Sequence, residues 1–276
     1  MMQTIHQTII EPKKGWQLID WRELREYRDL FYFLVLRDIK VLYKQTILGF
    51  AWAIIQPLFS MVIFSIVFGQ LAGVSTDGAP KAIFYYTALV PWTYFSNAMS
   101  GSTQSLISNA NMLSKIYFPR LVIPMTPVLA KLVDFAIAFA IVVVLLLWYQ
   151  IMPTVDVWVL PVLIMLMVGA AAGIGMWLSA LAIQYRDVRF AIQFLTQFLM
   201  YAAPVVWPVS LIPAQYRLLY GLYPMAGVIE GFRAALIGTT PMPWDLIGMG
   251  TVSTVVLLLS GAFYFRRMER IFADVA

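Results

Sequence analysis

The residues that could do chemistry in this sequence are few, and most lie outside its apolar stretches. Lys131 and Asp134 fall inside one long apolar run, and Glu230 falls inside a shorter one. A carboxylate in such a run can relay protons or pair with a nearby cation. Lys131 and Asp134 are three residues apart, a spacing that brings side chains together on a helix. We favour a structural ion pair because no second carboxylate or histidine continues a relay.

Several other kinds of chemistry are excluded by residues that the sequence lacks. It has no cysteine, and its only histidine, His6, lies in a polar N-terminal segment. Thiol chemistry is therefore excluded, and we expect no metal centre. No G-x-x-x-x-G-K-[ST] motif occurs, so the chain holds no ATP in a P-loop. We expect no cofactor bound to this chain.

The composition predicts the kind of element that must position these residues. Of the 276 residues, 61% are hydrophobic and 12% are charged, against roughly 45–50% and about 25% in soluble domains. A soluble enzyme spreads charge over its surface, whereas here the charges cluster and leave long apolar stretches. The sequence therefore predicts an all-α polytopic membrane protein. Its net charge of +5 then reflects basic residues on the cytosolic side rather than a nucleic-acid partner.

Six apolar segments are candidates for crossing a hydrocarbon core about 30 Å thick. We predict six transmembrane helices at about 47–71, 82–104, 122–150, 158–184, 190–206 and 246–265. Residues 1–44 form a cytosolic N-terminal segment, and residues 45–276 form the transmembrane domain. Fifteen Lys and Arg residues then lie on the side of the termini and three on the other side. This asymmetry predicts that both termini are cytosolic.

Two regions depart from the pattern of simple spans. Apolar residues at helical spacing between charges predict an amphipathic interface helix at about 21–36. The same pattern also fits a helix that packs on a partner protein, and the two alternatives are not exclusive. Prolines and charges interrupt the region of about 209–243, where we expect two short helices, at about 212–221 and 225–236. They could be external re-entrant helices between the fifth and sixth spans, or interfacial helices of an external loop. The sequence leaves both alternatives open.

Aromatic and polar side chains gather in the second predicted span. The set that could line a pathway comprises Tyr85, Tyr86, Trp92, Tyr94, Phe95 and Asn97. Sugar rings stack their C–H faces on aromatic side chains while their hydroxyl groups take hydrogen bonds. Simple helix packing explains the same residues equally well. Small residues in the fourth span, Gly169 and Gly173 among them, predict a face for close helix approach.

Four segments, in order along the chain, carry a more specific pattern. They are Arg37 to Leu58, Asn111 to Arg120, Tyr185-Arg186-Asp187, and Pro204 to Pro208. Together they resemble the bacterial ABC-2 type permeases that export cell-surface polysaccharides, such as O-antigen, capsule and teichoic acid. Ala203 and Tyr223 stand where this family leads us to expect Ser and Asn. Both departures lie in the outer segment and concern the external gate.

The resemblance implies a permease subunit of an ATP-driven exporter, not an enzyme. Such a permease moves lipid-linked polysaccharide of the O-antigen or capsule type across the bacterial inner membrane. Two copies of the chain would form the channel among membrane lipids. Two separate ABC ATPase subunits would bind ATP and magnesium and drive transport. No nucleic-acid partner is implied.

The resemblance also implies roles for three sets of residues. The coupling set, which would contact the ATPase, comprises Asn111, Lys115, Tyr117, Arg120, Arg186 and Asp187. The positive-inside rule alone would also explain Lys115 and Arg186. The headgroup set, which would receive a diphosphate headgroup at an access point in the inner leaflet, comprises Arg37, Lys40 and Lys44. Anionic phospholipids would be drawn equally well to that cluster. The external-gate set comprises Arg217, Glu230 and Arg233.

Three other functions compete with this interpretation. A proton-coupled secondary transporter would need ionisable groups within its spans and usually shows repeated halves. A membrane glycosyltransferase or lipid-modifying enzyme would need acid or base groups in a cleft. An ABC-2 exporter of a drug or a small lipid would share the fold and differ in its cargo.

Overall fold

The computed structural model describes residues 25–44, 51–113, 115 and 117–269, and every regular element within them is helical. The helices of 13 or more residues are α2 (Arg28–Lys44), α3 (Ala51–Phe64), α4 (Lys81–Ser108), α6 (Val122–Trp148), α7 (Leu160–Gln184), α8 (Val188–Ala202), α10 (Pro224–Leu236) and α11 (Trp244–Glu269). Shorter elements are η1 (Ser65–Leu71), α5 (Ala110–Leu113), η2 (Val155–Val159), η3 (Val209–Leu211) and α9 (Ala214–Gly221). The predicted all-α class is confirmed.

Four helical segments of the described chain are long and apolar enough to cross a membrane. They are Ala51–Leu71, Val122–Trp148, Val155–Gln184 and Trp244–Glu269. They confirm the prediction of a polytopic membrane protein. The second and fifth predicted spans correspond to α4, which has 28 residues but a polar sequence, and to α8, which has 15 residues. A full crossing takes about 20 residues, so the count of six spans stays a prediction.

The amphipathic helix near the N-terminus is longer than predicted. We expected it to end at about residue 36, but α2 continues to Lys44. The sequence from Arg28 to Lys44 contains no glycine or proline, so nothing in it stops a helix. The predicted start of this helix, residues 21–24, lies outside the described residues.

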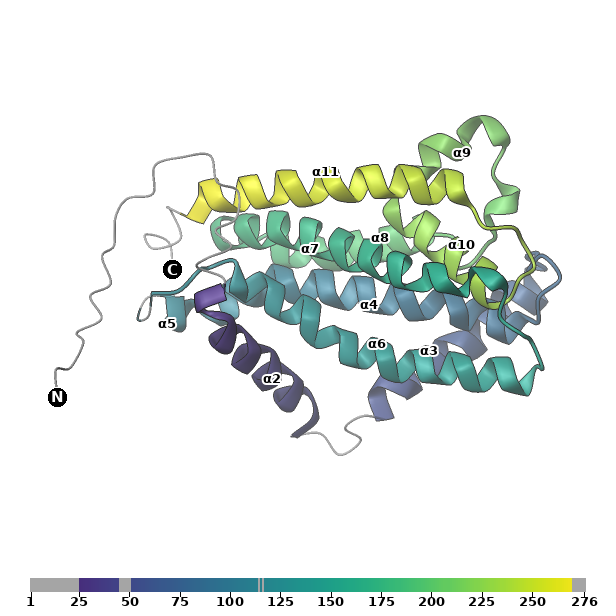
Figure 1. Cartoon of the computed structure of the whole chain (residues 1–276), viewed down its shortest axis with the longest axis horizontal. Coiled ribbons are helices and arrows are strands. Elements are labelled where there is room, and N and C mark those ends of the chain that lie inside the picture. The colour runs from purple at the N-terminus through teal and green to yellow at the C-terminus, as the bar shows by residue number, and fades with distance from the viewer. Residues whose placement is uncertain (1–24, 45–50, 114, 116, 270–276) are drawn as a thin grey trace.

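The long helices lie side by side along the longest axis of the molecule, while α2 runs obliquely against α6 (Figure 1). Helix α4 occupies the interior because it packs against α6, α7, α10 and α3. Helix α7 lies between α4 and α11. The short helix α5 and the α7–α8 connection lie at one end of the bundle, and α9 lies at the opposite end. These ends are called here the α5 end and the α9 end.

Helices α7 and α11 approach closely at the predicted small-residue face. A Cβ atom added to Gly173 would lie 2.7 Å from the backbone carbonyl carbon of Leu257. A Cβ added to Gly169 would lie 2.8 Å from the Thr254 side chain. Only residues without a side chain leave room for such close helix contact. The predicted packing face is therefore where α7 meets α11.

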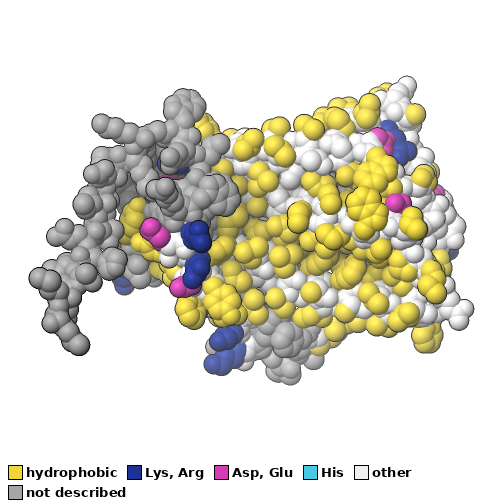
Figure 2. Space-filling model, viewed as in Figure 1, with side chains coloured by type: hydrophobic (Ala, Val, Ile, Leu, Met, Phe, Trp, Pro, Cys, Tyr) yellow, Lys and Arg dark blue, Asp and Glu magenta, His cyan; other side chains and the backbone are white. Residues whose placement is uncertain are grey.

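The surface of the protein is apolar over the middle of the bundle. Figure 2 shows hydrophobic side chains across this part of the face, with charged side chains nearer the two ends. Large side chains such as Leu147, Met165 and Val256 are exposed. So much exposed apolar surface is stable only against lipid or another protein, which agrees with membrane-embedded helices.

Candidate functional site

Five of the six residues predicted to line a channel lie inside the protein core. The side chains of Tyr85, Tyr86, Trp92, Tyr94 and Phe95 are all buried. The Tyr94 hydroxyl donates a hydrogen bond of 2.9 Å to the backbone carbonyl of Val128 on α6, and Tyr86 donates one of 3.3 Å to Ala138. Because α4 is surrounded by other helices, these aromatic residues fasten it to its neighbours. We therefore correct the prediction that Tyr85, Tyr86, Trp92 and Phe95 line an open channel, whereas Tyr94 also borders the cavity described next.

The sixth residue, Asn97, is half-buried and lines a cavity between α3, α4 and α6. The cavity also contacts Lys131 and Asp134 of α6. The Lys131 Nζ atom lies 2.9 Å from Asp134 Oδ2, so the predicted ion pair is confirmed. The cavity volume is about 240 Å³, and Trp52, Gln56, Thr93, Tyr94 and Phe135 add to its aromatic and polar lining.

Helix α8 presents an exposed aromatic face that the sequence analysis did not single out. Phe190, Phe194, Phe198 and Tyr201 are all exposed, and their spacing of three or four residues places them along one side of the helix. Gln193 and Gln197 are exposed beside them. We call these six residues the α8 face. The regular spacing of aromatic residues was a signal that could have identified it.

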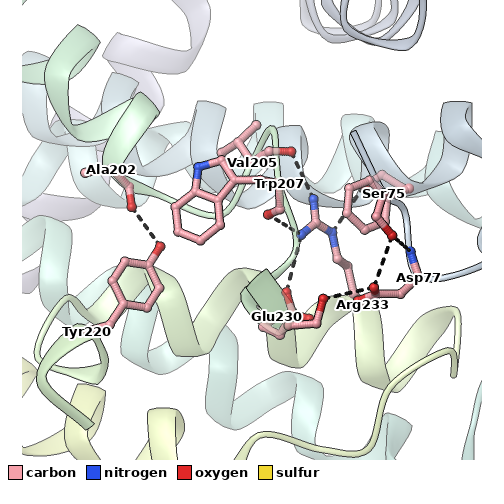
Figure 3. Close-up of polar contacts among 10 residues, drawn as sticks. Ser75, Asp77, Ala202, Val205, Trp207, Tyr220, Glu230 and Arg233 are labelled. Carbon is pink, nitrogen blue, oxygen red and sulfur yellow. Dashed lines mark hydrogen bonds and ion pairs between the residues drawn. The ribbon is translucent and has the colours of Figure 1, made fainter. Parts of the chain in front are cut away.

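The most buried functional candidate is an ion pair in α10. All thirteen residues of this helix are buried, including Glu230 and Arg233, whose side chains meet at 3.3 Å. The Arg233 guanidinium also stacks over the Phe84 ring of α4, with its carbon 3.5 Å from the ring centroid. Figure 3 shows the guanidinium pointing toward the backbone of the segment that follows α8.

Arg233 supplies hydrogen-bond donors to a buried segment that is not helical. Residues 203–208 connect α8 to η3, and Arg233 donates from Nη2 to the Val205 carbonyl at 2.9 Å. It also donates to the Trp207 carbonyl at 3.5 Å. Buried backbone carbonyls outside helices need such partners, because an unpaired polar group at membrane depth is costly. Arg233 therefore holds the break between α8 and α9 in place.

The structure divides the external-gate set. Glu230 and Arg233 are sealed in the interior, whereas Arg217 of α9 lies nearer the surface. Its Nε atom is 2.6 Å from Asp245 Oδ2 at the start of α11. The three residues therefore do not form one cluster, and we correct the assignment of a single gate. Arg217 joins α9 to α11, while the other two anchor α10.

The two short helices predicted near the outer end correspond to α9 and α10, and they differ in burial. Most α9 side chains are exposed, whereas α10 is enclosed by α4, α7 and α11. The Tyr220 hydroxyl of α9 donates a hydrogen bond of 2.7 Å to the Ala202 carbonyl at the end of α8. Burial raises the pKa of the Tyr220 phenol, which keeps this donor protonated. The burial of α10 favours a re-entrant helix, and the exposure of α9 favours an interfacial one.

The coupling set lies mostly on the surface of the α5 end (Figure 1). Its exposed members are Asn111, Lys115, Tyr117, Arg186 and Asp187. Arg120 differs because it is half-buried and its guanidinium donates a hydrogen bond to the backbone carbonyl of Glu269. We therefore correct its assignment as a contact residue, since Arg120 ties the start of α6 to the end of α11.

The headgroup set lies on α2, which packs against α6. Arg37, Lys40 and Lys44 are exposed, and their spacing places them on one face of the helix. Arg37 also forms an ion pair of 2.9 Å with the neighbouring Asp38. Among the described residues, no three His, Cys, Asp or Glu side chains come together as metal ligands.

Comparison with known proteins gives matches along most of the chain. The family model described as "ABC-2 type transporter" matches residues 29–237, which include all of α2 but its first residue, the cavity, the α8 face and α10. The chain is 27% identical over 251 residues to the O-antigen export system permease protein RfbA of Myxococcus xanthus, covering 90% of this chain and 96% of that relative.

Two further relatives come from other bacteria. An O-antigen export system permease protein RfbA of Klebsiella pneumoniae is 26% identical over 248 residues, covering 90% of this chain and 95% of the relative. The capsule polysaccharide export inner-membrane protein BexB of Haemophilus influenzae is 27% identical over 250 residues, covering 86% and 90%. Both similarities extend over nearly the full length of each relative.

Proposed function

Because the chain belongs to the ABC-2 type transporter family, we propose that it is the permease subunit of an ATP-driven exporter of cell-surface polysaccharide. One observation carries the proposal: the chain matches O-antigen and capsule export permeases over nine-tenths or more of their lengths. A permease subunit transports its cargo and catalyses no covalent reaction. The cargo proposed is a lipid-linked glycan of the O-antigen or capsule type.

The α8 face supports a polysaccharide cargo. Exposed aromatic rings can stack on the C–H faces of sugars, and the amides of Gln193 and Gln197 can hydrogen-bond to hydroxyl groups. Such contacts tolerate different sugars and break easily, as a moving chain requires. We propose that two copies of the protein turn their α8 faces toward a shared channel. This assignment replaces the buried aromatic residues of α4.

The energy source would be a separate protein. The sequence has no P-loop, so we propose that two ABC ATPase subunits bind ATP and magnesium. The exposed residues of the coupling set, Lys115 and Arg186 among them, would meet these subunits at the α5 end. This arrangement requires both termini in the cytosol and the protein in the bacterial inner membrane, as the excess of basic residues on that side supports.

The headgroup set would serve the lipid carrier. Arg37, Lys40 and Lys44 present three positive charges on one exposed face of α2. Such a cluster attracts a diphosphate through Coulomb and charge-assisted hydrogen-bond interactions. Anionic phospholipids are the competing ligands for the same face.

Deleting the gene in its bacterium tests the proposal. We expect loss of surface polysaccharide and accumulation of the lipid-linked glycan inside the cell, measured by immunoblotting of whole cells and of extracted lipids. The wild-type gene should restore export only when the partner ATPase is active. Unchanged surface glycan would overturn the proposal. Transport in vesicles that needs no ATP but follows a proton gradient would favour a secondary transporter.

A pair of matched variants tests the α8 face. We expect Phe194→Ala to reduce surface glycan by about threefold or more, because stacking on one ring contributes roughly 1 kcal/mol. Phe263→Ala, which removes an exposed ring from α11, is the control and should export normally. Co-purification with the ATPase should be unchanged in both variants. Equal export by the two variants would contradict the assignment of the α8 face.

A further inference from the structure

The cavity between α3, α4 and α6 is a second polar site, separate from the α8 face. Its polar and aromatic lining comprises Trp52 and Gln56 of α3, Thr93, Tyr94 and Asn97 of α4, and Lys131, Asp134 and Phe135 of α6, and small apolar residues complete the wall. Its volume is about 240 Å³, below the roughly 300–1,000 Å³ of sites for drug-sized ligands. A cavity of this size suits one small polar ring rather than a whole lipid.

The cavity lies deep along the bundle. Lys131 follows the first residue of α6 by nine positions, and Asn97 precedes the last residue of α4 by eleven. At about 1.5 Å per residue, both lie roughly 14–17 Å from the helix ends at the α5 end and about 25 Å from the other ends. Phospholipid headgroups stay at the membrane surface, outside a core about 30 Å thick. This depth argues against a resident headgroup and for polar cargo in transit.

The charge of the cavity favours a neutral ligand. Lys131 and Asp134 form a 2.9 Å ion pair, so their net charge is zero and neither a phosphate nor an ammonium ion is preferred. The lysine ammonium has three donors, and the pair with Asp134 uses one of them. The Asn97 and Gln56 amides can both donate and accept hydrogen bonds. A polyhydroxyl ring offers matching groups of both kinds.

Trp52 supplies the apolar half of such a site. Trp52 is 53% exposed and lines the cavity, so the protein does not fully cover its indole ring. Aromatic rings stack on the C–H faces of sugars while polar neighbours bind the hydroxyl groups. We propose that this cavity binds one neutral sugar ring of the glycan during transport. The proposal rests on the function proposed above and adds a binding site to it.

The absence of cysteine from the sequence allows a direct test by single-cysteine labelling. Thr93→Cys places a thiol on the cavity wall, and Gln215→Cys on α9 places one at an exposed control position. Each variant is labelled with a small, charged methanethiosulfonate reagent in membranes containing the complete transporter, stalled by an inactive ATPase. The membranes come from cells that make the glycan and from cells blocked in its first sugar-transfer step.

We expect Thr93→Cys to be labelled about threefold to tenfold more slowly when glycan is present. A sugar ring held in the cavity by a few hydrogen bonds would cover the thiol for most of the time. Gln215→Cys should react at the same rate in both membranes. Equal labelling of Thr93→Cys in both membranes would overturn the proposal. The absence of any labelling there would overturn it too, since the cavity would then exclude water.

A functional measurement separates this proposal from the proposed function. Asn97→Leu keeps a similar size but removes the amide, and Ser96→Ala changes the adjacent residue, which is not part of the cavity lining. We expect Asn97→Leu to lower the surface glycan about threefold to tenfold, with unchanged assembly with the ATPase, and Ser96→Ala to export normally. If gene deletion abolishes export but Asn97→Leu exports at the wild-type rate, the cavity proposal alone fails. If deletion leaves the surface glycan unchanged, the proposed function fails.

Discussion

Two ion pairs lie within the helical bundle at the same three-residue spacing but in different surroundings. The Glu230 and Arg233 side chains are 5% and 2% exposed and meet at 3.3 Å. The Lys131 and Asp134 side chains are 20% and 24% exposed and meet at 2.9 Å. The first pair is buried between α4, α10 and the non-helical segment after α8, and the second borders a cavity. Pair geometry alone therefore does not separate a structural pair from one that is available to a ligand.

The difference lies in what else the cation contacts. Arg233 donates hydrogen bonds to backbone carbonyls of the segment after α8 and stacks on Phe84, so its guanidinium is used for holding elements together. Lys131 is an ammonium group beside open space and polar side chains. The planar guanidinium of arginine can donate several hydrogen bonds to partners in fixed positions, whereas lysine carries its donors on a flexible stem. The surroundings point to an anchor in one case and a binding site in the other.

The largest expected effect on stability is at the buried pair of Glu230 and Arg233. Arg233→Met should destabilise the protein by about 3–5 kcal/mol, because it leaves the buried Glu230 charge without its cation. Thermal unfolding in detergent, monitored by tryptophan fluorescence, measures this change. The double variant Glu230→Gln/Arg233→Met should recover part of the loss. A wild-type melting temperature for Arg233→Met would show that the pair is not an anchor.

An intermediate effect is expected at the pair beside the cavity. Lys131→Met removes the cation from Asp134 and should destabilise the protein by about 1–3 kcal/mol. The double variant Lys131→Met/Asp134→Leu should be nearly neutral or stabilising, as replacing a whole ion pair by apolar residues often is. Its glycan export should nevertheless fall. If the double variant is stable and exports normally, the pair is only structural.

The smallest expected effect is at the ion pair that joins α9 to α11. Arg217 and Asp245 meet at 2.6 Å but both are more than one-third exposed. Water and salt screen such a pair, so Arg217→Met should change the free energy of unfolding by about 0–1 kcal/mol. The same thermal measurement in low and high salt checks this value. A loss as large as that of Arg233→Met would mean that distance, and not burial, ranks these pairs.

The features predicted correctly from the sequence depend either on short stretches of chain or on the overall composition. The Lys131–Asp134 pair follows from a three-residue spacing on a helix. The short helices α9 and α10 could be placed within a few residues because Pro213 and Pro224 directly precede or begin them. The membrane class follows from composition, which no arrangement of the helices changes. In each case the physical cause acts within one or two helical turns or sums over the whole chain.

The errors have a common physical cause in contacts between distant segments. Tyr85 and Phe95 are of the right type for a pathway, but α6, α7 and α10 cover α4 and bury them. Phe190 and Phe198 look like ordinary apolar residues, yet no described helix covers that side of α8, and both are exposed. Arg120 was assigned to a surface contact, but the end of α11 occupies its guanidinium.

The order of residues along this chain is enough to predict a helical membrane protein, the proline-marked short helices α9 and α10, and the ion pair between Lys131 and Asp134. Helical periodicity, chain-breaking prolines and hydropathy are local or additive quantities, so they can be evaluated without knowing the fold. Which aromatic face stays open, and which charged pair is sealed, depends on the packing of helices that are far apart in sequence. Those choices arise from contacts between α4, α8 and α10 and their neighbours, and they become visible only when the helices are assembled.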